Sequence, residues 1–547
     1  MKISGKLLLP GMALTVVACD DKSVCDRPNI LFCIADDATY AHFSAYGCDW
    51  VNTPGFDRVA SEGVLFNNCY TPNAKSAPSR AVVLTGRYSW QLETGGNHIT
   101  DFPARYKGFV EALGESGYMV GYTGKGWAPG NPGIMEDGSP RLLTGKPYQN
   151  FRKEPPARFI SDNDYTSNFI DFLEDSGEQP WFFWLGAHEP HRKYEYGVGV
   201  AKGGKSLDMI DRVPGFWPDN EVVRNDMLDY AFEIEHFDSH LVRILDELER
   251  RGELDNTIVV VTADNGMPFP RAKANNYEMS HHQPLAVMWG SRIRKKGRKI
   301  DDYVNFVDIA PTLLEAAGVD EAEAGMMPVQ GRSFVDILKS SREGQVCAER
   351  DHLVFGRERD DYGRPGNQGY PIRGMIRDGM MLILNLKPHL YPACNPEAGY
   401  CEIDGSPTKS VILDLWRSGK NSQFYSLSMG MRPAVELYDV AKDPDCLDNL
   451  AEKSEFKELA EKMRVELEGI LKSQGDPRMG EDGDIFDRYP YYQSQDWNFY
   501  EKVVSGEIDQ PWRITDWINP TDYDEYVRRL AAGEIEPMQE VLKGLHW

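Results

Sequence analysis

The chain has 547 residues, of which 41% are hydrophobic and 11% aromatic, and it carries a formal charge of −25 at pH 7. This size and apolar content predict one large domain with a substantial core plus a smaller domain, and they exclude a globally disordered chain. The acidic balance argues against a nucleic-acid partner, because binding phosphates requires a basic surface.

The N-terminal segment is typical of an exported protein. A short basic start at residues 1–6 precedes an apolar run at 7–18 that is too short to span a membrane. The run leads to Val16-Val-Ala-Cys19, which resembles the cleavage site of a bacterial lipoprotein signal. We therefore expect residues 1–26 to be a signal and tether, with a lipid on Cys19 as the sole membrane attachment. A plain secretory signal is the alternative, and in either case the protein is expected in the periplasm or at the cell surface.

Apolar runs alternate with helix-like stretches up to about residue 373, which predicts an α/β domain at 27–373 with a mostly parallel sheet. Polar residues follow three of the runs directly, which is where open α/β sheets place their sites. The predicted strands lie at 29–35, 118–123, 181–186 and 257–262, and the predicted helices at 54–63, 79–86, 110–116 and 227–251.

A composition shift near Gly374 predicts a second, smaller α+β domain at 374–475. Its predicted elements are a strand pair at 380–386, a strand at 435–439 and a helix at 456–473. We expect residues 476–547 to form an ordered appendage, because this stretch holds four of the twelve tryptophans.

The most informative motif is Ser76-Ala-Pro-Ser-Arg80, followed after four residues by Thr85-Gly86. It resembles the signature of the type I sulfatases, in which Cys or Ser precedes x-Pro-Ser-Arg. The resemblance implies that Ser76 is oxidised to formylglycine by a serine-type maturation enzyme, as in bacterial members, and that Arg80 orients it. An ordinary helix-capping serine is the alternative for Ser76.

The chemistry of the motif agrees with this resemblance. A serine hydroxyl is a weak nucleophile without an adjacent base, whereas a hydrated aldehyde carries two hydroxyls on one carbon. One hydroxyl attacks sulfur, and the other later expels sulfate by re-forming the aldehyde. The predicted helix N-terminus at this position favours an anion.

Two acidic pairs follow predicted strands, and the resemblance implies that they bind one calcium ion together with the modified Ser76. Asp36 and Asp37 end the first strand, and Asp264 and Asn265 follow the strand at 257–262. Three carboxylates and an amide oxygen suit Ca²⁺ rather than Zn²⁺. A pair of polar loops without a metal is the alternative.

The segment at 117–127 resembles the family pattern Gly-Tyr-x-Thr-x-x-x-Gly-Lys-x-His, with Lys125 as the sulfate-contacting lysine. Val120 stands in place of the Thr and Trp127 in place of the His, which leaves the base for sulfate elimination open. His98 is a candidate substitute, and a plain loop histidine is the alternative.

The remaining matches concern proton transfer and sulfate contact. His188-Glu-Pro-His191 resembles the family's His-x-Pro-His, which implies that His191 protonates the leaving atom and that His188 either contacts substrate or caps the loop. The stretch from Asp264 resembles the heparan N-sulfatase branch and implies that Lys273 contacts sulfate, with Arg271 as the alternative.

The resemblance extends over residues 27–472 and implies an alkaline-phosphatase-like α/β sandwich with a C-terminal α+β subdomain. Four arginines in a Gly/Pro-rich segment are candidates for contacts with an anionic sugar, with plain surface charge as the alternative. They are Arg357, Arg359, Arg364 and Arg373. Cys394 and Cys401 are close enough in sequence to form a disulfide after export.

The expected function is hydrolysis of sulfate esters or sulfamates on a sulfated oligosaccharide, such as a glycosaminoglycan or a mucin-type glycan. Two other functions stay open on the sequence. One is a phosphatase or phosphodiesterase of the same superfamily, and the other is a glycan-binding protein that has lost catalysis, which Trp127 suggests.

Overall fold

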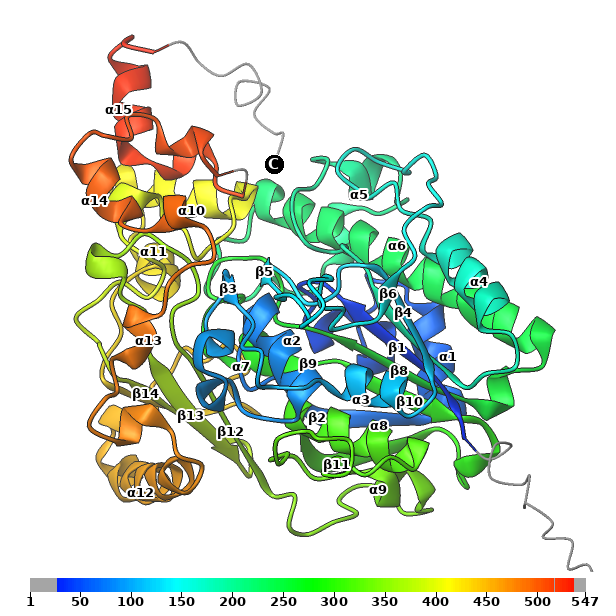
Figure 1. Ribbon diagram of the computed structural model, residues 1–547. Coiled ribbons are helices and arrows are strands. Elements are labelled where there is room, and N and C mark those ends of the chain that lie inside the picture. Colours follow the sequence, from blue (N-terminus) through cyan, green and yellow to red (C-terminus); the bar gives the residue numbers. More distant parts are fainter. Residues whose placement is uncertain (1–26, 516, 536–547) are drawn as a thin grey trace, which may run out of the picture.

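A mixed, mostly parallel sheet forms the centre of the structure, a computed structural model that describes residues 27–515 and 517–535 (Figure 1). Over these residues the sheet has nine strands in the order β11-β2-β10-β8-β1-β7-β4-β6, with β9 paired to β2. Strands β8, β1, β7 and β4 run parallel, whereas β10 is antiparallel to both its neighbours. The strands are β1 Asn29–Ala35, β2 Val64–Tyr70, β4 Met119–Gly124, β6 Lys146–Pro147, β7 Trp181–Gly186, β8 Thr257–Ala263, β9 His282–Gln283, β10 Leu285–Trp289 and β11 Arg298–Asn305.

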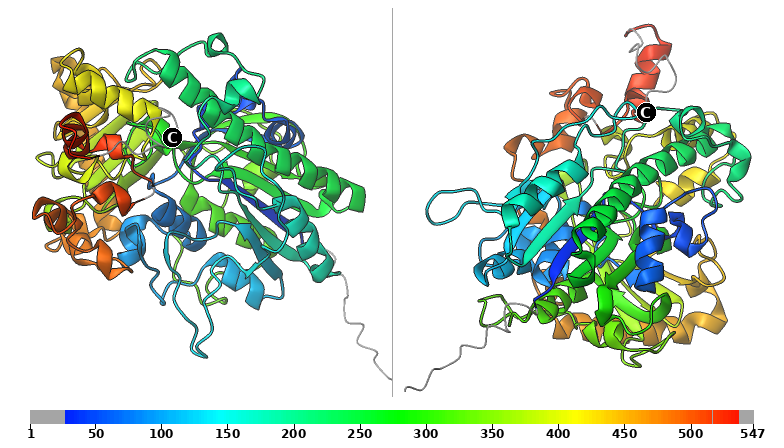
Figure 2. Two further views of the ribbon diagram at one scale, coloured as in Figure 1. Left: turned by 90° about the horizontal axis from the view of Figure 1, so that it is seen from above. Right: turned by 90° about the vertical axis from the view of Figure 1, so that its right-hand side faces the viewer.

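The central strands are apolar throughout because helices cover both faces of the sheet (Figures 1 and 2). In β1, Cys33 packs into the core on one face, and its neighbours Phe32 and Ile34 pack into the core on the other. Helices α1 Pro54–Glu62, α4 Tyr165–Ser176 and α6 Glu221–Arg251 cover the first face. Helices α2 Ser76–Thr85, α3 Phe109–Glu115 and α8 Ile309–Ala317 cover the second.

The predicted α/β class and its four strands are confirmed as β1, β4, β7 and β8. The helix predicted from residue 227 begins six residues earlier, at Glu221, where the Asn220 side chain accepts a hydrogen bond from the Val223 amide. Strands β2, β10 and β11 were not predicted. The first of them ends in Asn-Asn-Cys-Tyr, and this polar end breaks the apolar run that marks a buried strand.

A second, antiparallel sheet lies beside the first, with the order β12-β13-β14-β15 (Figure 1). Its strands are β12 His352–Arg357, β13 Ile372–Arg377, β14 Met380–Asn385 and β15 Val435–Asp439, and α12 Lys457–Ser473 packs on one face. The boundary predicted at Gly374 falls inside β13. The smaller sheet begins earlier than predicted, because β12 already pairs with β13 along its whole length.

The shorter elements complete the description. They are β3 Thr100–Asp101, β5 Gly130–Asn131, α5 Val198–Ala201, α7 Glu278–His281, α9 Val335–Lys339, α10 Pro407–Arg417, α11 Gln423–Ser428, α13 Ile485–Arg488, α14 Phe499–Val504 and α15 Asp524–Ala531. The last three helices run along one side of the molecule, next to α10 and the smaller sheet (Figure 1). Aromatic side chains of α14 and α15 form a cluster with Tyr362, Cys394 and Cys401, whereas Phe486 of α13 packs with the smaller sheet and α12.

None of the helices within residues 27–515 and 517–535 has the length and apolarity needed to cross a membrane. The signal segment and the lipid attachment expected at Cys19 lie outside the described residues.

Candidate active site

Ser76 is the first residue of α2 and lies at the carboxyl end of the central strands. Its side chain is buried, and its Oγ lies 3.2 Å from Asp36 Oδ1, Asn265 Oδ1 and Lys125 Nζ. The preceding residue, Lys75, occupies the N-cap position in extended backbone, so Ser76 stands in the first turn of the helix, where free amides favour an anion. The structure thus places the predicted nucleophile at a helix N-terminus and among the predicted metal-binding residues.

Three buried carboxylates gather around this serine. Asp36, Asp37 and Asp264 each offer an oxygen within 4.8 Å of the others. Consecutive residues at a strand end normally point to opposite faces, but Asp37 adopts left-handed backbone with φ 72°, which turns its carboxylate back toward that of Asp36. Its amide donates to Asp264 Oδ1 at 2.9 Å, and its Oδ1 accepts from Asn265 Nδ2 at 2.7 Å. The two acidic pairs predicted from the sequence therefore meet.

The donor set fits a hard divalent cation. Burial and the neighbouring Asp36 raise the pKa of Asp264 above its ordinary value. A divalent cation among these carboxylates would offset the repulsion between their negative charges. Carboxylate and amide oxygens are also the ligands that Ca²⁺ prefers. Asp36, Asp37, Asp264 and Asn265 are the residues that would hold it.

Arg80 of α2 and Lys125, which follows β4, neutralise the same cluster. The Arg80 guanidinium donates to Asp264 Oδ2 at 3.0 Å and to Asp36 Oδ1 at 3.2 Å. Lys125 Nζ donates to both oxygens of Asp36, at 2.8 and 2.7 Å. Although burial raises the pKa of Asp36, these two cations hold it well below its ordinary value.

Trp127 occupies the position where the sequence pattern has a histidine. Its side chain is buried, its Nε1 donates to the Ala77 carbonyl at 2.9 Å, and its ring packs edge-on against Phe102. The Trp127 indole therefore stabilises the first turn of α2 by this hydrogen bond, and it provides no proton acceptor for the reaction.

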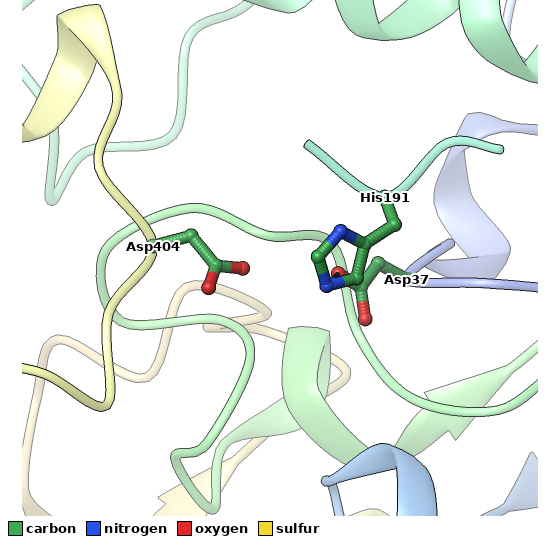
Figure 3. A group of neighbouring side chains, drawn as sticks. All are labelled: Asp37, His191 and Asp404. Atoms are coloured by element: carbon green, nitrogen blue, oxygen red, sulfur yellow. Dashed lines mark ion pairs between the residues drawn. The ribbon is translucent and has the colours of Figure 1, made fainter. Parts of the chain in front are cut away.

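A second group of side chains adjoins Asp37, and Figure 3 shows Asp37 together with two of its members, His191 and Asp404. Lys273 Nζ donates to Asp37 Oδ2 at 2.7 Å and to Asp404 Oδ2 at 2.9 Å, and His191 Nε2 lies 3.7 Å from Asp37 Oδ2. Burial lowers the pKa of Lys273, but the two carboxylates outweigh it and raise that pKa above its ordinary value. Asp404 precedes α10, far along the chain, and no local motif in the sequence marked it.

Between the two candidates for sulfate contact, geometry distinguishes Lys273 from Arg271. Lys273 lines the cavity above the carboxylates, whereas the buried Arg271 donates to the backbone carbonyls of Leu427 and Cys446.

A cavity of about 710 Å³ opens over Ser76. Three histidines line it: His191, the exposed His188 and the buried His98. The Nδ1 of His98 lies 3.0 Å from Asp361 Oδ1, and the other oxygen of Asp361 accepts from Lys75 Nζ at 2.5 Å. Burial lowers the pKa of His98 to about 4, although Asp361 acts in the opposite direction, so the ring is neutral at pH 7.

The four arginines expected to contact sugar lie elsewhere, which corrects the sequence interpretation. All are buried and outside the cavity lining. Arg357 and Arg364 pair with Glu402, and Arg373 binds Glu358 at 2.7 Å and Asp476 at 2.6 Å. Arg359 donates to the backbone carbonyls of Asp487 and Tyr489. Each of these arginines therefore connects segments that are far apart in the sequence, and these contacts form only when the chain folds.

Cys394 and Cys401 do not form the disulfide that their spacing would allow. Both thiols are free and buried, and they donate to the carbonyls of Tyr362 and Ala398, respectively.

Comparison with known proteins identifies the family. The sequence profile of the family described as Sulfatase matches residues 28–319. The chain belongs to the sulfatase family. This sulfatase is 25% identical over 492 residues to an ulvan-active sulfatase of Formosa agariphila, a match that covers 82% of this chain and 76% of the relative. It is also 25% identical over 473 residues to human N-sulphoglucosamine sulphohydrolase, covering 81% of this chain and 89% of the relative.

The fold agrees with that of solved sulfatases. One structure, determined in complex with D-glucosamine-2-N,6-O-disulfate, superposes with a TM-score of 0.56 at 21% identity and covers 82% of this chain and 98% of the other. The expected alkaline-phosphatase-like sandwich with a C-terminal antiparallel subdomain is therefore confirmed. The protein is a sulfuric ester hydrolase.

Proposed function

We propose that this sulfatase hydrolyses sulfate esters or sulfamates on sulfated saccharides of the glycosaminoglycan or mucin type, using Ser76 converted to formylglycine and a bound Ca²⁺. The observation that carries the proposal is the position of Ser76 Oγ. It lies at a helix N-terminus on the floor of the cavity and contacts Asp36, Asn265 and Lys125. The relatives whose names specify ulvan or sulfated glucosamine support a saccharide substrate.

Hydration of formylglycine would supply the two hydroxyls that the reaction needs, one to attack sulfur and one to expel sulfate. Calcium, held by Asp36, Asp37, Asp264 and Asn265 together with the modified residue, would supply a fixed positive charge beside the sulfate oxygens. A serine-type maturation enzyme is the partner that this modification requires.

The cations of the site stabilise the developing charge. Arg80 binds Asp264, Lys125 binds Asp36, and Lys273 binds Asp37. All three are held by ion pairs before substrate arrives, which is the preorganisation that makes electrostatic stabilisation effective.

Protons are handled by histidines that line the cavity. His191 Nδ1 is 2.7 Å from the Arg192 carbonyl, so Nδ1 carries the proton that donates to this oxygen, and Nε2 is the atom that faces the site. We assign to His191 the protonation of the leaving oxygen or nitrogen. His98 is the candidate base for elimination in place of the missing histidine, because it is neutral and Asp361 orients it. His188 is assigned a substrate contact.

The N-terminal segment adds a proposal about location. The basic start, short apolar run and Val16-Val-Ala-Cys19 support export, with a lipid on Cys19. Globomycin treatment of producing cells should cause an unprocessed precursor to accumulate. A precursor that is processed normally would favour the plain secretory signal.

The mass of one tryptic peptide tests the central proposal. Trypsin cuts after Lys75 and Arg80 and releases Ser-Ala-Pro-Ser-Arg. From protein produced with a serine-type maturation enzyme, we expect this peptide to be lighter than encoded by two hydrogens, and we expect sulfate release from sulfated sugars. An encoded mass without sulfate release, combined with sugar binding, would support the glycan-binding alternative. Release of phosphate but not of sulfate would support the phosphatase alternative.

A further inference from the structure

Three buried acids lie close together where α6 passes the loop after β7: Glu189 of that loop, and Asp229 and Glu233 of the helix. Glu189 accepts hydrogen bonds from a backbone amide at 2.9 Å and from a tyrosine hydroxyl at 2.7 Å. Asp229 accepts from two backbone amides at the start of α5. Two of the three acids are therefore satisfied within the protein.

Glu233 differs from both of its neighbours. It is 1% exposed and lines the cavity over Ser76, and in the described part of the chain its Oε1 is buried without a hydrogen-bond partner. A buried carboxyl oxygen without a partner is costly, because the water that it loses on folding is not replaced. A carboxyl group that is retained in a cavity wall at such a cost points to contact with a ligand.

The surroundings of Glu233 favour the neutral form of its carboxyl. Burial raises the pKa of Glu233 well above its ordinary value, and repulsion from Glu189 and Asp229 raises it further. Arg192 also lines the cavity, but both of its terminal nitrogens donate to Asp226, at 2.7 and 2.9 Å. A neutral carboxyl carries one O–H donor and one carbonyl acceptor side by side. The matching ligand group therefore accepts one hydrogen bond and donates another.

The position of Glu233 places this pair of groups near the sugar rather than near the sulfate. Its neighbour Glu189 is two residues before His191, to which we assign protonation of the leaving atom. The cavity of about 710 Å³ lies within the roughly 300–1,000 Å³ that is usual for sites of small organic ligands, so it has room for the sugar as well as its sulfate. Phe159, which is 39% exposed, adds aromatic surface to the same lining.

We propose that Glu233 is a specificity-determining residue that binds an uncharged substituent of the substrate sugar, either a hydroxyl or an acetamido group. Its O–H donates to the oxygen of that substituent, and its carbonyl accepts the hydroxyl or amide hydrogen. Both substituents supply one donor and one acceptor, which is the chemistry that a neutral carboxyl requires. This inference rests on the proposed function of the site.

Binding to protein that cannot turn over tests the role of Glu233. In the Ser76→Ala background, calorimetry would measure the Kd of galactose 6-sulfate, N-acetylgalactosamine 6-sulfate and glucosamine 6-sulfate. Glu233→Met removes the donor and the acceptor, and it should raise the Kd of the tightest-binding sugar by roughly three- to tenfold. Glu233→Gln keeps a neutral donor and acceptor, and it should keep that Kd within about twofold of the value for Glu233.

A parallel measurement of stability separates binding from folding. Glu233→Met should leave the free energy of unfolding unchanged or higher, because a buried oxygen without a partner is removed. Asp238 is the matched control, since it is an equally buried acid of α6 outside the cavity lining, and its carboxylate accepts from the amides of Gly55 and Phe56. Asp238→Asn should lower the free energy of unfolding and leave the Kd unchanged.

Three results would overturn the inference. The first is an unchanged Kd in Glu233→Met. The second is a Kd that rises as much in Glu233→Gln as in Glu233→Met, which would mean that an ionised Glu233 binds a cationic group such as the amine of glucosamine 6-sulfate. The third is no binding of any of the three sugars.

The preferred sugar distinguishes the two substituents, because N-acetylgalactosamine 6-sulfate carries an acetamido group where galactose 6-sulfate carries a hydroxyl. An encoded mass for the Ser76 peptide would defeat the proposed chemistry alone. The comparison of Kd values would still stand, since the Ser76→Ala background does not depend on formylglycine.

Discussion

Replacement of Asp404 by alanine probes a contact that only the folded chain brings about. Asp404 Oδ2 lies 2.9 Å from Lys273 Nζ, and both side chains are 4% exposed. The substitution leaves Lys273 with Asp37 as its remaining partner. A hydrogen bond between buried charged groups contributes about 2 kcal/mol. Because Lys273 keeps its ion pair with Asp37, the substitution costs less than it would if the ammonium were left buried without any partner. If the whole contribution of about 2 kcal/mol is lost from the stabilisation of the transition state, kcat/KM falls about 30-fold.

The assay is sulfate release by matured enzyme, run beside urea denaturation of the same protein. We expect kcat/KM to fall because Lys273 loses the contact that fixes its ammonium, and we expect Asp404→Asn, which keeps an oxygen acceptor, to lose less. Asp414→Asn is the control, because this exposed residue of α10 makes only a loose contact of 3.6 Å with Arg417. An unchanged kcat/KM in Asp404→Ala, with stability reduced, would show that the contact serves folding alone and would refute the argument.

Three further predictions follow from the same geometry. Arg373→Met should lower the free energy of unfolding by about 3–5 kcal/mol without changing KM, because it removes the arginine that pairs with the buried Asp476 and leaves Glu358 with Arg478 alone, away from the cavity. A raised KM at unchanged stability would restore the sugar-contact interpretation. Treatment with EGTA should abolish sulfate release and lower the free energy of unfolding. Adding Ca²⁺ at a hundredfold excess over its dissociation constant should restore about 2.7 kcal/mol of that free energy. Full recovery with Mg²⁺ alone would contradict the assignment of the site to Ca²⁺. Burial raises the pKa of Asp361, but Lys75 and His98 outweigh burial and hold this pKa far below the ordinary 3.8. The ionised Asp361 carboxylate therefore contributes its full stabilisation above pH 3.8. This stabilisation is lost as the pH falls toward the pKa that Asp361 has in the folded protein. The difference in unfolding free energy between wild type and Asp361→Asn should therefore shrink in acid, and a difference that stays constant with pH would count against the ion pair.

The positions of the predicted site residues follow from local rules. Ser76 is the first residue of α2, and the pairs Asp36-Asp37 and Asp264-Asn265 directly follow β1 and β8. These two strands are parallel neighbours, so their carboxyl ends meet at one edge of the sheet. A motif, an apolar run and a strand-end carboxylate can all be recognised within a few residues of sequence, and for this reason the centre of the site could be predicted.

Residues that act through distant partners could not be predicted in this way. The arginines at 357, 359, 364 and 373 suggested exposed recognition, because a Gly/Pro-rich stretch is usually a surface loop. Their burial depends on Glu402, Asp476 and backbone carbonyls near residue 489, which the sequence does not place beside them. The same holds for Cys394 and Cys401, whose spacing would allow a disulfide but whose thiols each donate to a backbone carbonyl.

By itself, the sequence determined the α/β class, the family and the residues around Ser76, since each of these depends on periodicity or on a contiguous motif. Only the tertiary structure decided which residues surround that centre. Asp404 and Asp361 reach it from beyond the matched family region, and Asp496 reaches it from near the end of the described chain. The physical reason is that local patterns report the conformation and burial of their own segment. Contacts between segments hundreds of residues apart exist only once the sheet, the smaller subdomain and the end of the chain have packed together.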